Sequence, residues 1–152
     1  MRRTSSSPCP CTSGRVYAEC CAPLHRGQRE AETPEALMRS RFAAFALGDA
    51  EYLWRTLHPD HEDCARDRAT VLAALRDVAR TLRFMRLTIL DASGSRVLFH
   101  AAVFDKGKDR SFVELSSFAR DDAGWRYVAG ETTPAPGPAP VDWTIEDGFP
   151  RT

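Results

Sequence analysis

Four of the five cysteines lie close together near the N-terminus, as two pairs. Cys9 and Cys11 form a Cys-x-Cys pair, and Cys20 and Cys21 follow after eight intervening residues. Four thiolates at this spacing can close a tetrahedron around one soft divalent ion. Zinc is the metal that such a ligand set favours, although sulfur-rich sites also accept iron. The sequence therefore predicts a tetrathiolate metal site.

Other interpretations of the cysteines are less favoured. The first residues contain no apolar stretch of a secretory signal, so we expect a cytoplasmic protein with reduced thiols. Adjacent cysteines also bridge only with strain, which disfavours a disulfide. A catalytic metal is disfavoured because four sulfurs leave no open coordination position. The alternative that stays open is a set of four buried or redox-active thiols without a metal.

A second group of residues could line a pocket. His58 follows a predicted helix, and Glu114 alternates with phenylalanines along a predicted strand, so these two are the candidate catalytic residues. Arg39, Arg41 and Trp54 are the candidates for binding a ligand beside them. The structural alternatives are that His58 ends its helix, and that Glu114 forms a buried ion pair with one of the two arginines.

The remaining titratable residues are expected to be structural. Cys64 is interpreted as an incidental, half-buried thiol, since no neighbouring histidine pattern supports a nucleophile. His25 and His61 are predicted to face solvent, and His100 to be a satisfied histidine within a sheet.

Three helices are predicted before any strand. Thr33 can cap a helix with Pro34 at its first position, and Gly48 can end it. Asp49 can cap a second helix that ends near Leu57, before Pro59. A third helix over about 67–82 has an apolar stripe of Val71, Leu75, Val78 and Leu82.

The pattern then changes to a period of two. Met85, Leu87 and Ile89 alternate with polar residues, and further strands are predicted over 97–104, 111–120 and 125–130. Their short turns predict an antiparallel meander. Three helices followed by such a sheet make an α+β fold, in which a curved sheet wraps around helices as a cone.

The chain divides into four segments on composition. Residues 1–7 are polar and expected to be disordered, residues 8–24 hold the cysteines, and residues 33–131 form the α+β domain. In 132–152 an alternating proline spacer leads to an acidic tail with Trp143, Ile145 and Phe149. These three apolar residues either dock on the sheet or form a motif for a partner.

Two resemblances rest on these motifs. Residues 8–21 resemble the SEC-C motif, the metal knuckle at the tail of the translocase motor SecA, whose partners there include the export chaperone SecB. A wider set resembles the YchJ-like bacterial family over about residues 8–131: Cys20-Cys21-Ala22-Pro23, Leu37-Met38-Arg39-Ser40-Arg41-Phe42, Ala44-Phe45, His58-Pro59, Glu114, Phe118 and Gly124-Trp125.

The resemblance implies a metal knuckle joined to an NTF2-like (cystatin-like) cone, in agreement with the order of helices and strands. It also implies, by analogy, that two copies could pair as a homodimer through the outer face of the sheet. One departure is Thr12, which stands where the knuckle usually has glycine, so we expect strain at a residue with positive φ. The family resemblance defines no reaction.

Composition narrows the function. The chain has 152 residues with 21 basic and 21 acidic side chains, which argues against a strongly basic nucleic-acid binder. Its apolar runs are too short to span a membrane. We expect an adaptor rather than an enzyme, with a surface-displayed knuckle that contacts a protein or ribosomal partner. The alternatives are nucleic-acid binding or nuclease action through the basic N-terminal segment (Arg2, Arg3, Arg15, Arg26 and Arg29), and a small-molecule or enzymatic pocket in the cone.

Overall fold

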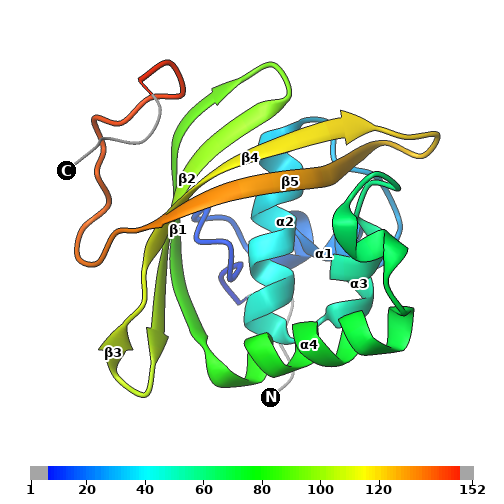
Figure 1. Cartoon of the computed structure of the whole chain (residues 1–152), viewed down its shortest axis with the longest axis horizontal. Helices are drawn as coiled ribbons and strands as arrows, with labels where there is room; N and C mark the ends of the chain where they lie inside the picture. The colour runs from blue at the N-terminus through cyan, green and yellow to red at the C-terminus, as the bar shows by residue number, and fades with distance from the viewer. Residues whose placement is uncertain (1–6, 148–152) are drawn as a thin grey trace.

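A computed structural model describes residues 7–147. The sheet follows the helices in the chain and curves around them, which confirms the α+β cone (Figure 1). The helical elements are η1 (Tyr17–Glu19), α1 (Ala22–His25), α2 (Pro34–Leu47), α3 (Ala50–Arg55), η2 (Glu62–Ala65) and α4 (Arg68–Thr81). The strands are β1 (Arg83–Ser93), β2 (Arg96–Asp105), β3 (Lys108–Asp109), β4 (Phe112–Arg120) and β5 (Trp125–Pro134).

The three main helices begin where their caps predict. The side chains of Thr33, Asp49 and Asp67 each accept a hydrogen bond from a backbone N–H in the first turn of α2, α3 and α4. Gly48 ends α2 in the left-handed conformation, with φ 77°. These local interactions fix the helix boundaries, and α3 is shorter than predicted, since it ends at Arg55.

The sheet is the predicted antiparallel meander. Its order is β1-β2-β4-β5, and the short β3 folds back onto β2 after the turn at residues 106–107. The inner face of β2 carries Val97, Phe99, Ala101 and Val103, which form the main core with α2 and α3. Within residues 7–147 no helix combines the length and apolar character that a membrane span requires.

Strand β1 departs from the predicted alternation. Its register shifts between Phe84 and Arg86, and again between Ile89 and Asp91. A bulge of this kind exchanges the two faces of a strand. Phe84 therefore packs on the core, whereas Met85, predicted to share a face with Leu87, is 50% exposed.

The tail docks on the outer face of the sheet. Ile145 is buried against Leu98 and Val113, with Trp143 packed beside them. The backbone N–H of Ile145 donates to Asp91 Oδ2 at 2.9 Å. Figure 1 shows this segment lying outside the sheet, on the side away from the helices. Of the two alternatives for the apolar tail residues, docking holds for Trp143 and Ile145; Phe149 and residues 1–6 lie outside the described residues.

Replacing Ile145 tests this docking. We expect Ile145→Ala to lower the free energy of unfolding by about 1–3 kcal/mol, because it removes buried apolar contacts with the sheet. Val141→Ala is the matched control in the same tail, since Val141 is 71% exposed. Chemical denaturation and limited proteolysis of residues 135–147 measure the effect. Equal behaviour of the two variants would show that the tail does not stabilise the sheet.

Candidate metal centre and neighbouring cavity

The structure brings the four N-terminal cysteines together. Their sulfur atoms all lie within 4.8 Å of one another, and Cys11 Sγ is 3.6 Å from Cys20 Sγ. Four sulfurs held about 2.3 Å from a central zinc would be about 3.8 Å apart, so the cluster is close to the size that zinc needs. None of the five cysteines of the chain is in a disulfide. The donor set and its compactness both fit a tetrathiolate metal site.

Local turns produce this arrangement. The N–H of Cys9 donates to the carbonyl of Arg15, which closes a small loop, and Gly14 reverses the chain inside it with φ 91°. The 3-10 helix η1 then delivers Cys20 and Cys21 opposite the first pair. Three of the cysteines are buried, and Cys20 alone is half-buried.

The thiols cannot all ionise without a cation. A hydrogen bond between Cys9 and Cys11 raises the pKa of Cys9 to about 12, and hydrogen bonds chiefly from Cys21 lower the pKa of Cys11. The pKa of Cys21 is raised because its hydrogen bond to Cys11 holds the proton. Cys11 is thus the favoured thiolate, and the thiols of Cys9 and Cys21 stay protonated and donate hydrogen bonds to it. A divalent ion would replace those protons, so metal affinity must fall in acid.

The knuckle (residues 8–24) packs against β1 and α2, and residues such as Gly14 and Arg15 remain exposed at the surface. Thr12 Oγ1 accepts a hydrogen bond from the N–H of Leu87 in β1 at 3.0 Å, and it donates to the carbonyl of Cys11 at 2.7 Å. Arg39 on α2 also donates to the Cys11 carbonyl. Thr12 has φ 60°, so the predicted positive φ is present. Its hydroxyl joins the strained loop to the sheet.

His25 also joins the knuckle to the cone, and the prediction that it faces solvent is wrong. Its Nε2 lies 2.8 Å from the carbonyl of Ser40 in α2, and its Nδ1 lies 2.7 Å from the hydroxyl of Tyr17. A carbonyl only accepts, so Nε2 carries the proton and Tyr17 donates to Nδ1. Burial lowers the pKa of His25, which favours this neutral form.

Helix α2 separates the knuckle from a cavity. Ala36, Arg39, Ser40 and Ala43 lie toward the knuckle or its cleft, while Met38, Arg41, Phe42 and Phe45 line the cavity. Both sets recur at the i, i+3, i+4, i+7 spacing of one helical face. At about 100° per residue the two faces are nearly opposite.

The cavity lies inside the cone and has a volume of about 270 Å³. Arg41 and Glu114, both predicted as pocket residues, line it. Arg39, Trp54 and His58 do not line it: Arg39 faces the knuckle, and the His58 N–H donates to the carbonyl of Tyr127 at the edge of β5. The structure therefore brings only Arg41 and Glu114 of the predicted set together in the cavity.

Glu114 is held by hydroxyl groups rather than by an arginine. Its Oε2 accepts hydrogen bonds from Ser116 Oγ at 2.6 Å and from the Tyr127 hydroxyl at 2.7 Å. Among the described residues neither Arg39 nor Arg41 forms an ion pair with it, so the interpretation as a salt bridge is wrong. A Cβ atom at Gly130 would lie 2.3 Å from Oε2, so a larger residue here would displace the end of this side chain.

His61, Asp63 and Tyr127 also line the cavity, although the sequence did not predict them as pocket residues. His61 is half-buried with its ring 5.5 Å from the ring of Tyr127, so the prediction that it faces solvent is wrong. Burial lowers the pKa of His61. The one signal available was the alternation of Tyr127 with Trp125 on the last strand, which places both on one face.

The two other candidates have the structural roles predicted for them. His100 is buried, and its Nε2 lies 2.9 Å from the carbonyl of Ala135 in the docked tail. Cys64 is half-buried, its thiol donates to the carbonyl of His58, and burial raises its pKa. Neither residue is placed to react with a ligand in the cavity.

The fold and the cysteine cluster together define an NTF2-like domain that carries a SEC-C metal-binding motif. Residues 33–130 match the model of the YchJ middle NTF2-like domain, and residues 6–23 match that of the SEC-C motif. The chain belongs to the YchJ-like family, whose curated relatives are called UPF0225 proteins.

Relatives and solved structures support this membership. The UPF0225 protein of Deinococcus radiodurans is 47% identical over 124 residues, which cover 80% of this chain and 86% of that protein. UPF0225 protein SCO1677 of Streptomyces coelicolor is 42% identical, over 82% of this chain and 94% of its own. The solution structure of a SEC-C motif containing protein from Rhodopseudomonas palustris has a TM-score of 0.68 and 36% identity, covering 81% of this chain and 96% of that one. A crystal structure of a SEC-C motif containing protein from Psychrobacter arcticus (TM-score 0.64, 22% identity, 82% of each chain) has the same fold.

Removing one sulfur tests the metal site. We expect Cys21→Ser to abolish the tight binding of one metal ion per chain, because three sulfurs no longer complete the tetrahedron. Cys64→Ser is the matched control and should bind metal as the unaltered protein does. Elemental analysis measures the metal, and hydrogen exchange over residues 8–24 should increase only in Cys21→Ser. Equal metal content in the two variants would exclude the four-cysteine site.

Thr12 allows the strain and the hydrogen bond to be separated. We expect Thr12→Ala to lower the free energy of unfolding by about 1 kcal/mol, because the part-buried N–H of Leu87 loses its acceptor. Thr12→Gly should cost about 1 kcal/mol less than Thr12→Ala, since glycine adopts a positive φ without strain. Chemical denaturation of the metal-loaded protein compares the two. A glycine variant no more stable than the alanine variant would contradict strain at this position.

Proposed function

We propose that this protein is a zinc-containing adaptor, in which the knuckle supports a cleft that binds a segment of a partner protein. The observation that carries the proposal is the position of Cys20. It is the one half-buried member of the cysteine cluster, and it lines a cleft of about 440 Å³ between the knuckle and the start of α2. Zinc is proposed because an all-sulfur tetrahedral set suits it best.

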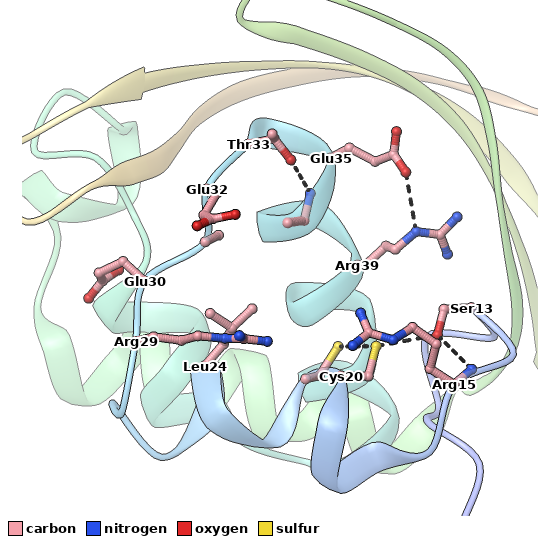
Figure 2. Close-up of a pocket in the computed structure, with 13 residues that line it drawn as sticks. Ser13, Arg15, Cys20, Leu24, Arg29, Glu30, Glu32, Thr33, Glu35 and Arg39 are labelled. Carbon is pink, nitrogen blue, oxygen red and sulfur yellow. Dashed lines mark hydrogen bonds and ion pairs between the residues drawn. The ribbon is translucent and has the colours of Figure 1, made fainter.

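The cleft has charges of both signs. Figure 2 shows Glu30 and Glu32 on the segment that precedes α2, and Arg15 on the knuckle. Glu32 and Arg15 are exposed, and neither forms an ion pair with another described side chain. A protein segment that bears both signs of charge can neutralise both.

This charge distribution favours a protein partner over a nucleic acid. Glu30, Glu32 and Glu35 line the cleft and would repel phosphate groups. Of the N-terminal arginines of the alternative, Arg15 and Arg29 line this same cleft beside the glutamates, and Arg2 and Arg3 lie outside the described residues. The metal site gives no support to an enzyme either, because four sulfurs saturate a tetrahedral ion.

Backbone N–H groups of a bound segment could donate to the Cys20 thiolate. The Ser13 hydroxyl lies 3.3 Å from Cys20 Sγ and occupies one side of that sulfur. Metal-bound thiolates remain acceptors for such donors. The knuckle would then have two roles, as a support for the cleft and as part of its binding surface.

Charge reversal in the cleft tests the proposal. We expect Glu32→Lys to reduce the recovery of co-purifying partner proteins at least tenfold, because an attractive contact becomes repulsive. Glu131→Lys, at an exposed acid on β5, is the matched control and should retain them. Quantitative mass spectrometry of material purified with each variant measures recovery, after elemental analysis has shown equal zinc content. An unchanged set of partners with Glu32→Lys would exclude the cleft as the contact.

A further inference from the structure

The cavity inside the cone contains a buried cation that forms no ion pair with a described residue. Arg41 is 4% exposed. Its Nη1 donates to the carbonyl of Leu53 at 2.8 Å and to Thr56 Oγ1 at 2.6 Å, whereas its Nε is buried and has no hydrogen-bond partner. Among residues 7–147 it takes part in no ion pair. A buried guanidinium in this state is costly unless an anion joins it.

The geometry of Arg41 leaves one edge for such an anion. The Nη1 contacts with Leu53 and Thr56 fix one side of the guanidinium, and the ring of Tyr127 lies 4.7 Å from its central carbon. Nε is buried without a hydrogen-bond partner, and the hydrogen bonds of the guanidinium to described residues come from Nη1 alone. These two adjacent N–H groups form the planar fork that matches a carboxylate.

The acids of the cavity already have donors of their own. Glu114 accepts from Ser116 and Tyr127, and Asp63 lies 3.4 Å from Arg66 Nη1. Neither acid is therefore the group that lacks a partner. The unpartnered hydrogen-bonding group in the wall is Arg41 Nε, a charged donor, which favours a ligand with an anionic acceptor over a cationic one.

Apart from His61 and Tyr127, the rest of the wall is apolar. It includes five phenylalanines, Phe42, Phe45, Phe84, Phe99 and Phe112. Leu75, Val78 and Leu82, three members of the predicted stripe of α4, also line the cavity, and Val78 remains 38% exposed. A volume of about 270 Å³ is near the lower end of ligand pockets, which are about 300–1,000 Å³. The cavity thus suits a small, largely apolar molecule.

We propose that the cone binds a small monocarboxylic acid with an aromatic or branched aliphatic body. Its carboxylate accepts hydrogen bonds from Arg41 at the fork of Nε and Nη2, and its body lies among the phenylalanines between α2, α4 and the sheet. This site is separate from the knuckle cleft, because α2 lies between them.

Titration of the full-length, metal-loaded protein tests the site. The probes are phenylacetate and isovalerate, the neutral analogue phenylacetamide, and the cationic analogue phenethylamine. We expect saturable binding of a carboxylate, at least about tenfold tighter than that of phenylacetamide, because only the carboxylate forms a charge-assisted pair with Arg41. Isothermal calorimetry gives the affinities, and NMR shifts of cavity residues give the location.

Variants assign the binding to the cavity. Ala101→Leu places a larger apolar side chain inside it and should abolish carboxylate binding while Arg41 is kept, because Ala101 lines the cavity and is 1% exposed. Arg41→Lys keeps the charge without the fork and should weaken binding about tenfold. Arg76→Gln, at an exposed arginine of α4, is the control and should bind as the unaltered protein does. Circular dichroism shows whether each variant is folded.

Several results would overturn the proposal. These are the absence of carboxylate binding at millimolar concentration, equal affinity for phenylacetamide, tighter binding of phenethylamine, or unchanged binding by folded Ala101→Leu. If Arg41→Lys does not fold, the comparison of analogues and the Ala101→Leu variant still decide the matter.

Discussion

The burial of the middle of helix α2, over residues 37–44, between the cone and the knuckle is the constraint on which the structure depends. The sheet and α4 enclose one face of the helix, and the knuckle covers the opposite face. A helix so placed cannot be amphipathic, and its sequence mixes small, apolar and a few polar residues around its whole circumference. Ser40 illustrates the consequence: it is fully buried, and its hydroxyl lies 2.6 Å from that of Tyr52. Each buried polar group on α2 needs a partner from a neighbouring element.

The small residues of α2 explain how the knuckle approaches so closely. Ala43 packs against Cys9, Cys11 and Cys21. Its small side chain lets the helix backbone lie close to these cysteines. Within the knuckle, Leu24 packs into the main core, and a bound metal would add folding free energy to this contact. The hydrogen bonds of Thr12 and His25 then transfer that rigidity to β1 and α2. The knuckle is thus part of the cone's wall.

Much of this could be predicted from sequence, because the signals are local. The caps Thr33, Asp49 and Asp67 and the spacing of the cysteines depend on residues within a few positions of one another. The β1 bulge could not be predicted, since the register of a strand depends on its partner: Phe84 and Met85 are both apolar, and only pairing with β2 decides which points inward. Docking of Ile145 on Leu98 and Val113 likewise depends on a contact across the sheet.

The candidate pocket shows the same limit more sharply. Arg39 and Arg41 are two residues apart on one helix, a rotation of about 200°, so one faces the knuckle and the other the cavity. Sequence could place both on α2 but could not choose between them, because both faces are buried and neither shows the polar character of a surface. Similarly, His58 lies beyond the end of α3, whereas the ring of His61, only three residues later, lies beside the ring of Tyr127. In each pair, the residue that lines the cavity is the one whose side chain lies beside the ring of Tyr127 on β5. Gly130, also on β5, leaves the space in which Glu114 and Tyr127 meet. The placement of polar side chains in the cavity therefore depends on β5, whereas α2 supplies the positive charge of Arg41.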